Sequence, residues 1–208
     1  MRNLTIIEII LVFIVPVYII YKSPFFYKNR QWIFGPILLI IGLLMFFEKY
    51  TLYKLGFRSD NIIHSLLPYF IFTFSGIGIS ILISNYLDKK PVKNWWRFSH
   101  FHTDFITLSF LQELIYRGYL MPKLETIFHS VIITIILNSL IFAFIHIIYP
   151  NKLRNFLLTF VAGLFFATIY YFYPNLYLIT ISHSALNFVT LLYGIIGPND
   201  FKDKQILC

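Results

Sequence analysis

A charged pair interrupts an apolar stretch at residues 110–118, which read FLQELIYRG. Glu113 and Arg117 are four residues apart, so both side chains lie on one face if the stretch is helical. A charge at bilayer depth is energetically costly and usually faces the interior of a helix bundle, which makes it a candidate functional residue. The stretch therefore predicts a membrane helix with a polar inner face.

Two later apolar segments repeat this spacing. Residues 142–146 read FAFIH and end in His146, and residues 182–187 read SHSALN and contain His183 and Asn187. The first segment offers a single polar side chain, and the second offers two that lie one helical turn apart on the same face. Three helices of this kind predict a polar cavity that holds water within a membrane.

The composition indicates an integral membrane protein. The chain is 58% hydrophobic and 12% charged, with a mean hydropathy of +0.73, whereas soluble domains are about 45–50% apolar and roughly 25% charged. The net charge of +8 comes mostly from short loops, where Lys and Arg set membrane topology. We therefore expect the lipid bilayer as a partner and no nucleic acid. The single cysteine, Cys208, excludes an intrachain disulfide and a CxxC metal site.

The apolar runs predict an all-α, polytopic transmembrane helical bundle that forms a single integral membrane domain over residues 1–208. A spanning helix needs about 20 mostly apolar residues, and backbone groups in lipid must be hydrogen-bonded internally, as they are in helices. We expect about seven spans (six to eight), at residues 4–21, 32–47, 62–86, 105–127, 130–148, 155–172 and 177–195.

The loop charges predict an orientation. More Lys and Arg residues fall on the side that holds the C-terminus than on the side that holds the N-terminus. The positive-inside rule then predicts a multi-pass protein of the plasma membrane with a cytoplasmic C-terminus.

The predicted helix ranges put His146 near one end of its helix and His183 roughly 9 Å from the opposite end of its own. A common site therefore requires tilted or broken helices.

Each candidate residue has a catalytic and a structural interpretation. A desolvated Glu113 suits general acid–base work, but with Arg117 it can equally form a structural ion pair. Histidine in general titrates near neutral pH, which would suit His146 to acid–base work, yet a lone His near a helix end is more often a packing residue. His183 and Asn187 donate hydrogen bonds that can stabilise an oxyanion or join neighbouring helices. In the first apolar run, Glu8 is an acid without an obvious partner, and we keep it as a second candidate site.

Taken together, the three motifs resemble the CPBP family, which comprises CAAX prenyl endopeptidase and bacteriocin-processing (Abi) intramembrane proteases. The resemblance covers about residues 105–190 and rests on Glu-x-x-x-Arg-Gly, Phe-x-x-x-His and His-x-x-x-Asn in that order. It implies that Glu113 with His146 activates a water. It also implies that His183 and Asn187 support the oxyanion and that Arg117 orients the glutamate. We assign Phe142 and Tyr116 to substrate binding.

One position departs from the family pattern. The pattern begins with two adjacent glutamates, of which the first is usually assigned as the base, and this chain has Gln112 followed by Glu113. A glutamine cannot accept a proton at neutral pH, although it can hold a water. Three interpretations remain: Glu113 is the base, the chain is an inactive relative, or Gln112 is a deliberate substitution that stalls the enzyme. We favour the first because the other motif residues are present.

The sequence thus predicts a glutamate-type intramembrane endopeptidase that hydrolyses a peptide bond of a membrane-associated protein or peptide. The alternative is a catalytically silent immunity or peptide-binding membrane protein of the same fold, which Gln112 favours. A transporter is disfavoured because no internal repeat is visible. Glu113 with two histidines can in principle bind zinc, but no His-Glu-x-x-His signature is present. We therefore expect no cofactor or metal ligand, with a zinc-dependent enzyme as the alternative.

Overall fold

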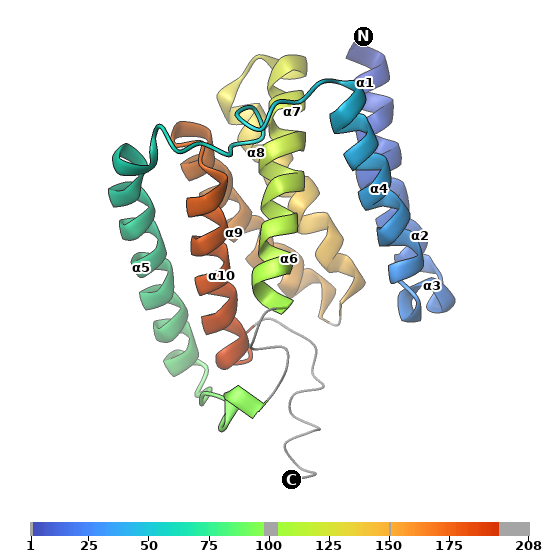
Figure 1. Ribbon diagram of the computed structural model, residues 1–208. Coiled ribbons are helices and arrows are strands. Elements are labelled where there is room, and N and C mark those ends of the chain that lie inside the picture. The colour runs from blue at the N-terminus through green and yellow to red at the C-terminus, as the bar shows by residue number, and fades with distance from the viewer. Residues whose placement is uncertain (1, 98–103, 150, 196–208) are drawn as a thin grey trace.

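The computed structural model describes residues 2–97, 104–149 and 151–195, and every regular element in these ranges is helical (Figure 1). The N-terminal part contains α1 (Arg2–Ile9), the π-helix η1 (Ile10–Ile14), α2 (Val15–Lys22), α3 (Pro24–Lys28), α4 (Gln31–Phe47) and α5 (Ile62–Tyr86). After the short 3₁₀-helix η2 (Trp95–Arg97) come α6 (Asp104–Glu113), the π-helix η4 (Leu114–Leu120) and α7 (Met121–Phe128). The chain continues with α8 (Val131–Phe144), the 3₁₀-helix η5 (Ile145–Ile148), α9 (Lys152–Phe172) and α10 (Leu176–Leu192).

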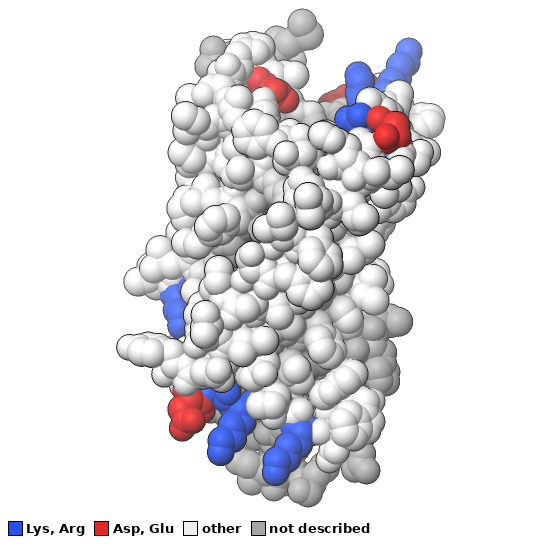
Figure 2. Space-filling view, turned by 90° about the vertical axis from the view of Figure 1, so that its left-hand side faces the viewer, with Lys and Arg blue, Asp and Glu red and all other residues white. Residues whose placement is uncertain are grey.

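Helices occupy all seven ranges for which membrane spans were predicted. In the described part of the chain, four are long and apolar enough to cross a membrane: Asn3–Lys22, Ile62–Tyr86, Val131–Ile148 and Lys152–Phe172. On the face shown in Figure 2, Lys, Arg, Asp and Glu gather mostly toward the two ends, with a broad uncharged band between them. This distribution fits the all-helical membrane class. The number of spans, the host membrane and the side of the C-terminus stay predictions.

The helices that carry the three motifs pack at the centre of the bundle. α8 packs along α9, and α10 packs against both α5 and α6. The first helices, α1 to α4, lie at the opposite side of the bundle from α5 (Figure 1). In this arrangement, each of the three predicted motif helices, α6, α8 and α10, either contacts another motif helix or shares a neighbouring element with it.

Two of the motif helices depart from α geometry at the motif itself. The π-helix η4 begins at the residue after Glu113, and the 3₁₀-helix η5 contains His146. Short π segments inside α-helices are frequent at functional sites. Asn138 on α8 donates a hydrogen bond of 2.6 Å to the carbonyl oxygen of Tyr116, inside the π segment. The irregular helices that a common site requires are therefore present, although this does not test the site.

The segment between α4 and α5 lies against the motif helix. A Cβ added at Gly118 would come within 2.8 Å of the backbone oxygen of Leu55, so the glycine of the first motif permits a close approach of this segment. The neighbouring Gly56 has a φ of +89°, a conformation that glycine adopts readily, and its carbonyl accepts a hydrogen bond of 2.7 Å from Leu176 N. We therefore attribute the glycine at position 118 to the close approach of this loop, which leaves no room for a side chain.

Candidate active site

Glu113 joins two of the predicted motif helices. Its Oε1 lies 2.6 Å from Nδ1 of His183 on α10, and Glu113 has no exposed surface. His183 is almost as deeply buried, at 5% exposure. A contact this short between a carboxylate and an imidazole is a charge-assisted hydrogen bond. The first and third motifs therefore meet directly.

Arg117 occupies the other side of the same carboxylate. Its Nε lies 3.3 Å from Glu113 Oε2, and both side chains have no exposed surface. The guanidinium carbon lies 4.3 Å from the ring centroid of Phe142 and 5.8 Å from that of Phe166. Aromatic faces attract a cation in such positions, so the buried charge of Arg117 has both a carboxylate and two rings beside it.

A second polar contact lies next to the Glu113–His183 pair. Asn187 Nδ2 donates a hydrogen bond of 3.0 Å to Oγ of Ser109. Ser109 precedes Glu113 by four residues and Asn187 follows His183 by four residues. The two contacts therefore form successive rungs between antiparallel helices, and they fix the register of α6 against α10. Sequence reasoning missed Ser109, although its position one turn before Glu113 was a usable signal.

His146 approaches the site through an aromatic ring. Its Nδ1 lies 3.3 Å from the backbone oxygen of Phe142 in its own helix, and its ring centroid lies 5.5 Å from that of Phe142. The Phe142 ring also lies 6.0 Å from His183. Phe142 thus contacts both imidazoles, whereas the polar contacts of the Glu113 carboxylate go to His183 and Arg117.

Tyr116 and Gln112, the remaining predicted site residues, lie at different depths. Tyr116 is 6% exposed, packs edge-on against Phe142 and lies tilted against Phe13 of η1, which makes it part of the hydrophobic core. Gln112 is partly buried, and neighbouring residues of a helix project about 100° apart. The amide of Gln112 and the carboxylate of Glu113 therefore leave the helix in different directions.

Two further contacts were not foreseen from the sequence. The ring of Phe166 on α9 lies 4.7 Å from the His183 ring and forms one wall of the site. Glu8, which had no evident partner in the sequence, accepts hydrogen bonds from Lys123 and from the hydroxyl of Tyr119, and Lys123 also lies 2.7 Å from Glu48. Glu8 therefore has partners that were not obvious from the sequence, because they are distant in the chain.

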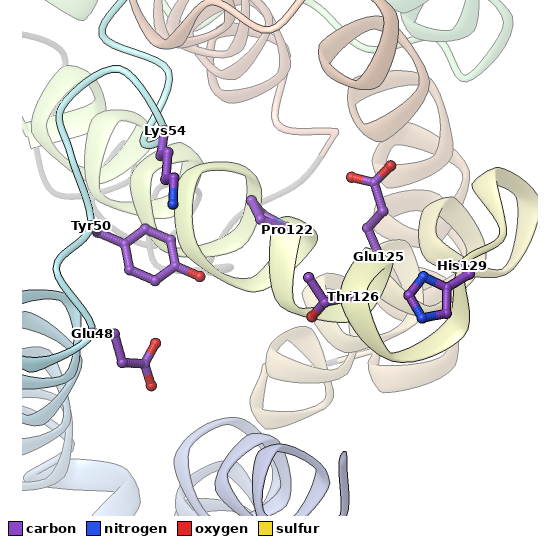
Figure 3. Close-up of a pocket in the computed structure, with 7 residues that line it drawn as sticks. All are labelled: Glu48, Tyr50, Lys54, Pro122, Glu125, Thr126 and His129. Carbon is purple, nitrogen blue, oxygen red and sulfur yellow. The ribbon is translucent and has the colours of Figure 1, made fainter. Parts of the chain in front are cut away.

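The predicted polar cavity stays a prediction. A pocket of about 440 Å³ lies between α7 and the segment after α4 and contains none of the predicted site residues (Figure 3). It is lined by Glu48, Tyr50, Lys54, Pro122, Glu125, Thr126 and His129. Within the described ranges, no three His, Cys, Asp or Glu side chains are grouped as metal ligands would be. Metal dependence and the individual catalytic roles also stay predictions.

Comparison with known protein families finds a match over the motif region. Residues 94–189 match the family described as type II CAAX prenyl endopeptidase Rce1-like, and this range contains all three predicted motifs. Neither curated proteins nor solved structures gave a significant match.

Proposed function

Residues 94–189 belong to the CPBP family through their match to type II CAAX prenyl endopeptidases, and from this premise we propose that the protein is an intramembrane endopeptidase. Its substrate would be a membrane-associated protein or peptide, since two of the helices that carry the site, Val131–Ile148 and Leu176–Leu192, are apolar. The observation that carries the proposal is the 2.6 Å contact between Glu113 and His183. A buried acid and imidazole from separate helices form a proton-transfer pair of the kind that hydrolases use.

Electrostatics favours one protonation state for this pair. Glu113 and Arg117 carry opposite charges and are both fully buried, so a neutral His183 leaves the group without net charge. Burial disfavours an unbalanced charge. In the neutral imidazole, Nδ1 then donates to Glu113 and Nε2 keeps its lone pair. We therefore assign proton removal from water to His183 Nε2, in place of the Glu113–His146 pair to which the family resemblance gives this role.

In the proposed reaction, a water loses its proton to His183 Nε2 while its oxygen attacks the scissile carbonyl carbon. Glu113 holds the imidazole in the reactive tautomer and stabilises the imidazolium that forms. When the tetrahedral intermediate collapses, the C–N bond breaks and the imidazolium returns the proton to the leaving amine. His146 supplies a second acceptor for the water, and the Asn187 amide donates to the carbonyl oxygen.

The direct experiment is cleavage of membrane-anchored reporter peptides by the purified chain in lipid vesicles. Cleavage by the wild-type chain that disappears in a variant of the proton-transfer pair supports the proposal. If no peptide from a broad reporter set is cleaved, the endopeptidase assignment is wrong.

A silent, peptide-binding protein of the same fold is the second candidate. Gln112 stands where the family pattern has its first glutamate, and both oxygens of Glu113 are already engaged by His183 and Arg117. Such a carboxylate is well suited to holding helices together, which is what a silent relative requires.

The variant Gln112→Glu separates the two candidates. If Glu113 is the functional carboxylate, we expect the added carboxylate to change kcat/KM less than about tenfold, because one general base already acts there. A matched variant, Gln31→Glu at the start of α4, controls for added negative charge. Activity that appears only in Gln112→Glu would identify the natural chain as a silenced enzyme.

We expect cleavage to survive chelation. Glutamate–histidine chemistry needs no metal, so incubation with 1,10-phenanthroline should leave the initial rate within about twofold of the untreated rate. In a zinc enzyme the metal lowers the pKa of its bound water, so removing the metal would stop cleavage. The measurement is the initial rate of peptide cleavage before treatment with the chelator and after the chelator has been dialysed away. Loss of activity that added zinc restores would replace this mechanism with a metal-dependent one.

A further inference from the structure

The guanidinium of Arg117 has hydrogen-bond donors that the proposed reaction does not use. Its Nε faces Glu113 Oε2 at 3.3 Å, an ion pair without hydrogen-bond alignment, and neither Nη1 nor Nη2 has an acceptor among the described residues. The whole side chain has no exposed surface. A guanidinium has five N–H donors, four of them on the two Nη atoms. Buried polar groups are nearly always hydrogen-bonded, so these donors indicate a ligand with oxygen acceptors.

The surroundings of Arg117 stabilise its charge and leave its donors free. The rings of Phe142 and Phe166 lie 4.3 and 5.8 Å from the guanidinium carbon and attract the cation, but they contain no oxygen acceptor. The same two rings lie 6.0 and 4.7 Å from the ring of His183. The unused donors of Arg117 and the imidazole of His183 therefore share the same aromatic walls.

The charges at this position favour an anion once the site is working. Before reaction, Arg117 and Glu113 balance each other beside a neutral His183. A proton taken up by His183 adds one positive charge to a fully buried group, and an anion beside the guanidinium restores the balance. Guanidinium is planar, and its paired donors match the two oxygens of a carboxylate-like group.

We propose that Arg117 anchors an oxyanion-binding subsite next to the Glu113–His183 pair. Its ligand is a small, planar or tetrahedral oxygen anion held by Nη1 and Nη2. In turnover this chemistry has two sources, the terminal carboxylate of a peptide or the oxyanion that forms at the scissile carbonyl. The identity of the natural ligand rests on the proposed protease function, whereas the binding of a small oxyanion does not.

The test uses formate as the probe. The purified full chain in detergent is titrated with sodium formate, with sodium chloride of equal ionic strength as the reference, and the unfolding temperature Tm is followed. The wild-type chain is expected to show a saturable rise in Tm that chloride does not give. Arg117→Lys keeps the positive charge beside Glu113 but lacks the fork of donors. Its half-saturating formate concentration is expected to rise about tenfold or more, because formate loses at least one charge-assisted hydrogen bond in this variant.

Two controls keep the test interpretable. Arg58→Lys changes an arginine that is paired with Asp60 outside the motif helices, and it should keep the wild-type formate response. The double variant Glu113→Gln/Arg117→Gln removes both charges together, so it avoids an unpaired buried charge if Arg117→Lys does not fold, and it should lose the response. A formate response absent from the wild-type chain, or equal in Arg117→Lys, would overturn the subsite and indicate that these donors bind water alone.

A second arm distinguishes the two sources of the anion. Reporter peptides that end in a free carboxylate are compared with the same peptides ending in a primary amide. A higher KM for the amide identifies the peptide terminus as the ligand, and equal KM values with a lower kcat in Arg117→Lys identify the reaction oxyanion. Because the formate titration needs no turnover, a chain that binds formate without cleaving any peptide refutes the protease function and leaves the subsite standing.

Discussion

Replacing His183 with Asn is expected to lower kcat roughly 10²–10⁴-fold, the usual contribution of a general base, while the protein stays folded. The Asn amide nitrogen occupies nearly the place of the imidazole Nδ1, so it can keep the hydrogen bond that His183 makes to Glu113 at 2.6 Å. It has no counterpart of Nε2, so the water keeps its proton. The measurement pairs the cleavage rate in vesicles with Tm in detergent.

The matched control is His64→Asn, which changes a histidine near the start of α5 that contacts Tyr173. We expect wild-type cleavage from this variant. Glu113→Gln is a less informative change, because it leaves the buried Arg117 charge without its carboxylate and should reduce stability as well as activity. Near-wild-type kcat in His183→Asn would exclude His183 as the base and return that role to His146.

Replacing Lys123 with Met is expected to reduce the free energy of unfolding by about 3 kcal/mol, the lower end of the range for breaking a buried ion pair. The Lys123 side chain is 6% exposed and contacts the carboxylates of Glu8 and Glu48, which are 19% and 35% exposed. Methionine fills a similar volume but leaves two carboxylates facing each other without a cation. Their partial exposure keeps the loss near the low end.

The cluster of Glu8, Glu48 and Lys123 connects the first helix and the end of α4 to α7. Denaturant unfolding in a fixed detergent measures the loss, with Lys54→Met as the control. Lys54 is exposed, and removing its charge should change stability by no more than about 0.5 kcal/mol. The triple variant Glu8→Gln/Glu48→Gln/Lys123→Met should recover much of the loss. Equal stability of Lys123→Met and Lys54→Met would show that the cluster contributes nothing.

Gly118 illustrates how a correct motif can have a different physical basis from the expected one. Small residues in membrane helices usually permit close packing against another helix. Its actual neighbour is the backbone oxygen of Leu55, in the segment between α4 and α5. The sequence identifies the need for a small residue there, but it does not say which distant backbone comes near.

From the sequence alone we predicted the all-helical class, helices in seven ranges and a resemblance to the family that residues 94–189 match. Hydropathy and spacing within one helix are local properties, so the polar faces around Glu113, His146 and His183 can be read from positions four residues apart. The tertiary structure alone decided which groups touch. Glu113 meets His183 across 70 residues and Glu8 meets Lys123 across 115. Such contacts depend on the order and register in which whole helices pack, and no spacing within a single helix encodes that register.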